Sequence, residues 1–418
     1  MKKYVILAPT ISNMGGAQMY VRNKQIYYKK QGWNSCIIAG QGENICIPEL
    51  NKFPKTYYEL NFCSYMFSEK VQKRIESELI NTIYDDKYSE IVIESTSITT
   101  STWAELVAKK IKAKHLVFLL QERNDINNTG LLEFLKFKYK RKELAGITVK
   151  TIRDMFAPFF LIDEKLSYSL SAHCNNVVEN VDSPILQQIY KIKYSHIIGC
   201  LSRLDKPFVL PALNDFKDYA DSHPNMRFLL LLIGNIPHGQ STIVNSISSI
   251  FSKTNNVEYI ITGYLYPIPT KLLEICDAFF CSAGSCRVCM ASGVPTISYD
   301  GKDFKPIGVM GHTTKNSLFR DTNEPAIAFS ILMDEILVEN KYSKIPADYN
   351  HLEPDFRLHS DFINNSAKDA DYFEIKSLCR ETKTDRNVSF MLALIGANTY
   401  GRLRKYKFSK WLKHKTCD

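Results

Sequence analysis

The residues best suited to bind an anion form a turn in the second half of the chain. A short apolar run ending at Cys281 is typical of a buried strand, and residues 286–292 have the composition of a short helix. The turn between them consists of Ser282, Ala283, Gly284 and Ser285. A helix that begins there leaves backbone N–H groups without partners, the serines add hydroxyl donors, and the glycine permits a close approach. The turn predicts a phosphate site, and an ordinary strand-to-helix connection is the alternative.

Two cations follow the apolar run Ile197–Leu201, which is also predicted to be a strand. We expect Arg203 and Lys206 at the carboxyl edge of the same sheet as the turn, where open α/β sheets bind ligands. An arginine can bind a phosphate through two hydrogen bonds, and a lysine adds a point charge. Together with the turn they would stabilise the negative charge of a diphosphate, so no metal is required. A solvated surface pair is the alternative.

Two glutamates are candidates for contact with a substrate hydroxyl or for transfer of its proton. Glu122 follows a strand predicted at 115–120, with Arg123 beside it, and Glu94 ends a strand predicted at 90–94. We expect the substrate role for Glu122 first and for Glu94 second. A helix cap or a salt bridge with Arg123 is the structural alternative for Glu122.

A pair of glycines ends the loop after the first predicted strand, Tyr4–Ala8. Gly15 and Gly16 precede a helix predicted over 17–31, again at the carboxyl end of a strand. We therefore expect this loop to face a ligand. Gln18 either supports the start of the helix or contacts the substrate.

The cysteines do not indicate a metal site. Eleven are scattered along the chain, and this odd number in apolar surroundings favours reduced thiols in a cytosolic protein. Cys286 and Cys289 form a C-x-x-C, but no second pair of zinc ligands accompanies them. The only Asp-x-Asp, formed by Asp369 and Asp371, lies in a polar region and is predicted to be at the surface.

The elements that must position these residues alternate between strands and helices, which predicts an α/β fold. We predict strands at 4–8, 35–39, 90–94, 115–120 and 145–149, within 172–181, and at 197–201, 228–233, 257–261, 278–281 and 296–299. We predict helices at 17–31, 100–113, 131–143, 210–222, within 266–276, and at 286–292 and 325–339, with Pro325 at the first helical position. A chain of 418 residues suits two doubly wound Rossmann-like domains facing across a cleft. The predicted division is 1–183, 184–380 and a basic amphipathic segment at 381–418, with 182–195 as the connection.

The net charge of +9 suits anionic ligands or an anionic membrane surface. Basic and aromatic residues are interleaved at 136–142 and again at 402–415, a mixture that binds anionic lipid. A solvated helix face is the alternative for both segments. No motif for nucleic-acid binding accompanies the charge, so no nucleic-acid partner is expected. No signal peptide or membrane span is recognisable. We expect a cytoplasmic protein, peripheral on the inner face of the membrane.

In their order, these motifs resemble the GT-B glycosyltransferases, over roughly residues 1–300. The closest resemblance is to the large retaining nucleotide-sugar family of bacterial polysaccharide assembly. Met14-Gly-Gly-Ala-Gln18 resembles the family's first-strand loop, which faces the acceptor and the donor phosphates. Gly199-Cys-Leu-Ser-Arg-Leu-Asp-Lys206 resembles its Gly-Arg-Leu…Lys signature, whose Arg and Lys hold the diphosphate. The remaining matches are Gly234 at the next strand tip, Gly263, Tyr264 and Leu265 after the strand that meets the base, and Met290–Pro295 at a helix end.

The sequence departs from this family at two glutamates. The second of them falls near Val288, which is apolar, and the turn at 282–285 replaces the first. The spacing from Arg203 to Lys206 is also shorter than usual.

The resemblance implies a hexosyltransferase that moves a sugar from a UDP- or GDP-linked donor to a growing, lipid-linked cell-surface polysaccharide. Such transfer would be retaining and would use no metal or other cofactor. Two alternatives remain: a nucleotide-sugar 2-epimerase of the same fold, and a glycosyltransferase-like protein that binds without catalysing. Residues 300–315, beside the donor turn, could form a lid or a plain surface loop.

Overall fold

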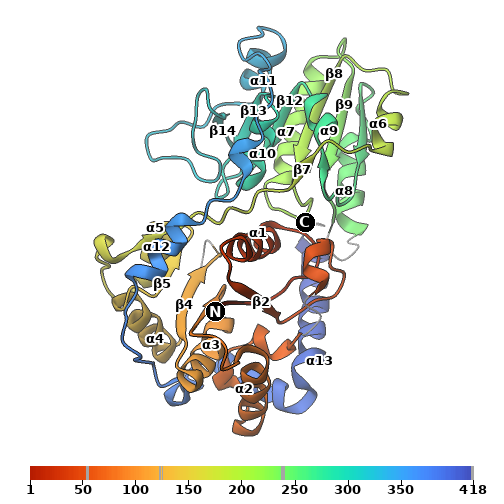
Figure 1. The fold of residues 1–418 in the computed structure, drawn as a ribbon. Coiled ribbons are helices and arrows are strands. Elements are labelled where there is room, and N and C mark those ends of the chain that lie inside the picture. The colour runs from red at the N-terminus through yellow and green to blue at the C-terminus, as the bar shows by residue number, and fades with distance from the viewer. Residues whose placement is uncertain (53–55, 122–123, 125, 237–240, 416–418) are drawn as a thin grey trace. The chain divides into compact units, whose positions relative to one another are not determined.

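The computed structural model describes all residues of the chain except 53–55, 122–123, 125, 237–240 and 416–418 (Figure 1). The chain forms two compact units. Unit 1 comprises Met1–His173 and Pro354–Asp418, and unit 2 comprises Cys174–Glu353. Among the described residues, no helix combines the length and the hydropathy that a membrane span needs.

Unit 1 contains a six-stranded sheet in the order β2-β1-β3-β4-β5-β6, and all its pairings are parallel. The strands are β1 (Lys2–Ala8), β2 (Asn34–Ala39), β3 (Glu90–Ser95), β4 (Lys114–Leu119), β5 (Leu144–Gly146) and β6 (Tyr168–Ser169). The helices of this part are α1 (Gly16–Lys30), α2 (Glu69–Ile83), α3 (Ile98–Ile111), α4 (Thr129–Lys140) and α5 (Val149–Phe156).

The sequence of β1 explains why helices cover both faces of this sheet. Val5 and Leu7 pack into the core that α2 and α3 complete. Tyr4 points to the other face and stacks on Tyr28 of α1, with ring centroids 4.0 Å apart. A continuous apolar run of this kind is typical of a parallel strand buried on both sides. Side-chain caps then start the helices that follow: Ser97 forms a capping box with Thr100 at the start of α3.

Unit 2 contains a second six-stranded sheet in the order β10-β9-β8-β12-β13-β14, parallel except for the β13–β14 pair. Its strands are β8 (His196–Leu201), β9 (Phe228–Ile233), β10 (Val257–Ile261), β12 (Ala278–Cys281), β13 (Thr296–Tyr299) and β14 (Pro306–Val309). Two short strands, β7 (Val178–Glu179) and β11 (Ile268–Pro269), pair with each other. The helices are α6 (Pro184–Ile189), α7 (Val209–Ser222), α8 (Ser241–Phe251), α9 (Thr270–Glu274), α10 (Gly284–Ala291) and α11 (Phe329–Leu337).

The end of the chain belongs to unit 1. Helix α12 (Arg357–Asn365) buries His359 and Phe362 there, and α13 (Lys383–Lys415) buries Val388, Leu392 and Ala397 in the unit 1 core. Gly396, with φ 76° and ψ 164°, interrupts the helical backbone of α13. The C-terminal segment predicted as basic and amphipathic is therefore a core-packing helix in its first half.

The division by contacts differs from the predicted one. Unit 1 ends at His173 rather than at 183, and residues 354–380 return to it instead of remaining with the second domain.

Two predicted elements are also wrong in detail. The sixth strand of the unit 1 sheet is Tyr168–Ser169, whereas Val178 and Glu179 pair with β11. The helix expected to start at Pro325 begins at Phe329, because Ala328 is extended and forms its N-cap.

Candidate functional site

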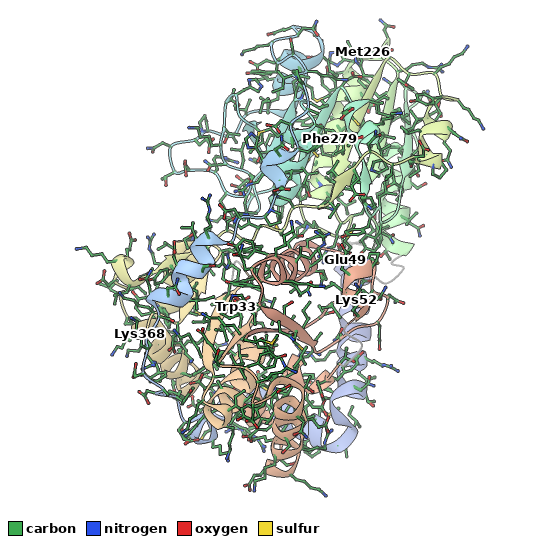
Figure 2. All side chains as sticks on the ribbon, viewed as in Figure 1. Trp33, Glu49, Lys52, Met226, Phe279 and Lys368 are labelled. Carbon is green, nitrogen blue, oxygen red and sulfur yellow. The ribbon has the colours of Figure 1, made fainter. Side chains whose placement is uncertain are left out.

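The order of strands in unit 2 reverses between β8 and β12. From β8 the sheet grows through β9 and β10 in one direction, and through β12 and β13 in the other. Loops leaving two such strands separate in opposite directions, so their carboxyl ends are the favoured place for a ligand. Phe279 of β12, labelled in Figure 2, faces Gly199 of β8 in this pairing. A Cβ on Gly199 would lie 2.1 Å from the Phe279 ring, so the two strands can meet this closely only at glycine.

Both predicted cations follow β8 at this edge. Arg203 is 43% exposed at its side chain, and its Nε lies 3.1 Å from Oδ1 of Asp205. Lys206 is half-buried, and no carboxylate of the described residues lies within ion-pair distance of its ammonium. Gly234 at the tip of β9 has φ +156°, and a Cβ there would lie 1.8 Å from the carbonyl oxygen of Ser202. The loop of the two cations is thus packed directly against the neighbouring strand tip.

The predicted anion-binding turn starts α10. Ala283 has φ 61° and ψ −137°, and no side chain caps the helix after it. The backbone N–H of Cys286 donates to the carbonyl oxygen of Ala283 at 3.1 Å. For the N–H groups of Gly284 and Ser285, the described part of the chain offers no acceptor within hydrogen-bond distance. These two N–H groups could donate hydrogen bonds to a bound anion.

Ser282 does not have the role predicted for it. Its buried hydroxyl donates to the carbonyl oxygen of Tyr299 at 2.9 Å, so it joins β12 to β13 and is not available to a ligand. Ser285, half-buried in the first turn of α10, keeps its hydroxyl available in the described structure.

The thiol of Cys174 marks where this turn meets the cations. A Cβ on Gly284 would lie 3.1 Å from its Sγ. Burial raises the pKa of Cys174, and the positive charges of Lys206 and Arg287 act in the opposite direction. Lys206 exerts the same effect on Cys286 of α10, whose pKa burial raises. Lys206 and Arg287 therefore both act electrostatically on a thiol that lies beside the start of α10.

Arg287 was missed by the sequence analysis. It is exposed on the first turn of α10, and no carboxylate of the described chain pairs with it. Its position three residues after Gly284, in a helix that was predicted, is the signal that could have identified it.

The other predicted donor residues lie along the same edge or close to it. Gly263 has φ +73° with no atom within 4 Å of an added Cβ, so only the backbone conformation requires glycine there. Tyr264 and Leu265 follow it and are half-buried, with Leu265 packed on the core.

Residues 300–315 are held by the unit 2 sheet and do not form a free lid, because they include β14, which pairs with β13, and the N–H of Met310 donates to the carbonyl oxygen of Thr296 at 2.8 Å. Asp300 is buried and accepts the N–H of Lys302 at 2.6 Å and that of Arg320 at 2.7 Å. The carbonyl oxygen of Ser317 accepts the N–H of Ala283 at 2.5 Å. The segment that follows β14 is thereby fixed beside the start of α10.

In unit 1 the glycine loop and its glutamine start α1. Gly15 is the N-cap, and Gly16 is the exposed first residue of the helix. The side chain of Gln18 is buried and donates to the carbonyl oxygen of Thr10 at 3.3 Å, which supports the helix start. Of the two alternatives for Gln18, the structure shows the structural one.

Glu94 is not placed to touch a substrate. It is 1% exposed, and it accepts hydrogen bonds from Tyr4, Tyr20 and Lys24. The Lys24 ammonium also lies 2.8 Å from Nδ1 of His359 in α12. Burial lowers the pKa of Lys24 to about 8, against the opposing charge of Glu94. Glu94 is thus the partner of a buried ion pair inside unit 1. Glu122 and Arg123 lie outside the described residues.

The basic segment 136–142 is not a free cationic face either. Lys138 is 1% exposed, and its Nζ lies 2.6 Å from Glu105 and 3.0 Å from Glu143. Arg141 pairs with Asp369 at 2.9 Å. Three of the five cations of the segment, Lys136, Lys138 and Arg141, therefore pair with carboxylates of unit 1. Membrane binding by the segment stays a prediction. The surface position predicted for Asp369 and Asp371 is confirmed, since their side chains are 67% and 64% exposed.

The cysteines near α10 are buried thiols. The Sγ atoms of Cys281 and Cys289 lie 3.4 Å apart, and Cys286 is buried beside them. Within the described residues, no group of three or more His, Cys, Asp or Glu side chains is arranged to hold a metal ion.

No protein-family model matches the sequence, and no curated protein matches it. The structure is similar to the crystal structure of a glycosyltransferase from Rickettsia africae ESF-5, with a TM-score of 0.59 and 16% identity, covering 95% of this chain and 98% of that one. It is also similar to HepE from Anabaena in complex with UDP and glucose, with a TM-score of 0.57 and 13% identity, covering 94% of this chain and 100% of HepE. The chain has the GT-B fold. Since fold alone does not fix an activity, the function must be argued from the site.

Proposed function

We propose that the protein is a glycosyltransferase that takes a sugar from a nucleotide-diphosphate donor. The observation that carries this proposal is the carboxyl edge of β8 and β12, where Lys206 and Arg287 have no carboxylate partner among the described residues and the first N–H groups of α10 have no acceptor. The site combines positive charge with free backbone donors, which is what a diphosphate needs. HepE, which shares the fold, binds UDP and UDP-glucose in its crystal structures.

The chemistry of sugar transfer suits these groups. Breaking the bond to the anomeric carbon adds negative charge to the leaving diphosphate. Lys206, Arg287 and the N–H groups of Gly284 and Ser285 would stabilise this charge, and Arg203 would add a bidentate contact once released from Asp205. A retaining reaction in which the acceptor proton passes to the leaving phosphate needs no strong base from the protein, and we propose this course with no metal.

One observation favours a second candidate, a protein that binds a nucleotide sugar without transferring it. The first turn of α10 carries no acidic residue, and Val288 is fully buried. No carboxylate from this helix can therefore contact the sugar hydroxyls. Release of nucleoside diphosphate in a single turnover separates the two candidates.

We propose a growing, lipid-linked cell-surface polysaccharide as the acceptor, with attachment to the inner face of the membrane. The basic segment 402–415 supports this attachment by its composition. Its described beginning contacts unit 1: Arg402 lies 3.4 Å from Glu43, and the guanidinium of Arg404 lies 5.9 Å from the centroid of the Phe62 ring.

Thermal unfolding in the presence of UDP or GDP tests donor binding. We expect one of them to raise Tm, and we expect Arg203→Ala to abolish the rise because a charged contact to phosphate is lost. Lys253→Ala, an exposed position of unit 2, is the matched control and should leave the rise unchanged. A protein whose Tm responds to no nucleotide would contradict the proposal.

A further inference from the structure

We propose that the loop Ala157–Ile162, called the apolar loop below, inserts into the surface of an anionic membrane. The loop follows α5 and contains no polar side chain. Leu161 is 94% exposed and Phe159 is 52% exposed. Transfer of these side chains from water into lipid is favourable, and a segment this short can only enter one leaflet.

The backbone of the apolar loop is fixed. The N–H groups of Phe159 and Phe160 donate to the carbonyl oxygen of Phe156 at 2.8 and 3.0 Å. The Phe160 ring packs on that of Phe156, with centroids 4.5 Å apart. The hydroxyl of Tyr139 donates to the carbonyl oxygen of Asp163, just after the loop. Phe160 is thus an anchor, and the side chains of Phe159 and Leu161 are displayed from a held position.

The charges beside the loop suit anionic lipid. The ammonium of Lys136 lies 5.1 Å from the centroid of the Phe160 ring. Of the nearby carboxylates, Glu164 pairs with Arg153, Asp154 with Lys150 and Glu133 with Lys136. Asp163, directly after the loop, is exposed and has no ion-pair partner in the described structure. Three exposed or half-buried lysines have no ion-pair partner in the described structure: Lys140, Lys142 and Lys165. Each lysine near an anionic surface adds to binding.

The shape of the loop favours a bilayer over a protein partner. A stable protein interface needs a broad complementary patch on each side. Leu161 has almost no neighbours, since nearly all of its surface is exposed, so it projects as a single apolar group. A projecting group flanked by lysines meets the requirements of an interfacial membrane contact.

This inference deepens the proposed function, and it rests on that proposal only for the lipid-linked acceptor. Binding of the full chain to vesicles of phosphatidylcholine with phosphatidylglycerol tests it without any nucleotide. We expect Leu161→Ser to weaken vesicle binding roughly tenfold, because the inserted apolar surface is lost. Ile345→Ser is the matched control in unit 2, where Ile345 is 61% exposed, and it should bind like the wild type. In Leu161→Trp, the tryptophan emission should shift to shorter wavelength with vesicles.

Three results would overturn the inference. The wild type could fail to bind these vesicles, or Leu161→Ser could bind them as tightly as the wild type does. Alternatively, the wild type could self-associate without binding vesicles, and Leu161→Ser could remove that self-association. The loop would then be an interface between copies of the chain. The Tm of Leu161→Ser should rise with UDP or GDP as much as that of the wild type. This control shows that donor binding is intact, so a failure of vesicle binding then counts against this inference alone.

Discussion

The two units use the same charged residue types in opposite ways. Unit 1 buries its charges: Lys24 with Glu94, and Lys138 with Glu105 and Glu143, lie in its interior. In the described part of unit 2, Asp300 is the only charged side chain among the buried residues, and its oxygens accept backbone N–H groups. By contrast, Lys206 follows β8 and Arg287 lies in the first turn of α10 after β12, so both are placed at the carboxyl edge of the sheet.

This difference separates structural charge from functional charge. A buried ion pair satisfies itself and leaves nothing for a ligand. A cation without a carboxylate partner, next to unpaired backbone donors, can be satisfied by an anion instead. Under the proposed function, the buried lysines of unit 1 serve only its interior, whereas Lys206 of unit 2 remains available to a diphosphate.

The largest effect should come from removing a buried lysine. Replacing Lys138 by Met takes a buried cation away from both Glu105 and Glu143 and leaves them only His115 and Arg141 as partners, which should cost roughly 3–5 kcal/mol of unfolding free energy. Lys206→Met, the matched change in unit 2, should cost less than about 0.5 kcal/mol. Denaturant unfolding of both variants measures the contrast. Equal losses would show that Lys206 is as structural as Lys138.

Acid should weaken unit 1 in a defined pH range. Burial and the charge of Lys138 lower the pKa of His115 from 6.5 to about 4, so the folded state takes up its proton later than the unfolded state. Stability contributed by neutral His115 is present above pH 6.5 and is lost as the pH falls to about 4. The pKa of Glu105 is lowered from 4.5 to about 2, where Lys138 and His115 outweigh burial, so its contribution is lost between those values.

The loss of unfolding free energy that comes from His115 amounts to about 3 kcal/mol or less, since one pKa unit is worth 1.36 kcal/mol. Unfolding free energies measured from pH 7 downward should show it, and His115→Gln should flatten the decline between pH 6.5 and 4. An equally steep decline in the variant would assign the effect to other groups.

Most of the fold could be predicted from the sequence, because buried strands are apolar throughout and strand ends carry turn residues. Phe228–Ile233 and Ala278–Cys281 match their predicted bounds for this reason. Parallel pairing then predicted that the loops of Lys206 and Gly284 share one edge. The return of residues 354–380 to unit 1 could not be predicted, since it depends on His359 reaching Lys24 across a sequence separation of 335 residues.

The candidate site was harder to predict, because residue type does not reveal a partner. Glu94, Lys138 and Lys206 each resemble functional residues in sequence. Only the structure shows that Glu94 and Lys138 are neutralised in the interior, while Lys206 is not. Arg287 went unrecognised because its role depends on Cys174 and Lys206 being brought beside the start of α10.

Calorimetric titration of UDP and GDP into the wild type and into the Lys206→Ala, Arg287→Ala double variant tests the central claim most directly. If these two cations hold the diphosphate, the wild type binds one of the nucleotides and the double variant loses roughly 100-fold or more in affinity, at about 1.5–3 kcal/mol for each charged contact. Its unfolding free energy should stay close to that of the wild type. A folded double variant that binds the nucleotide with wild-type affinity would contradict the account.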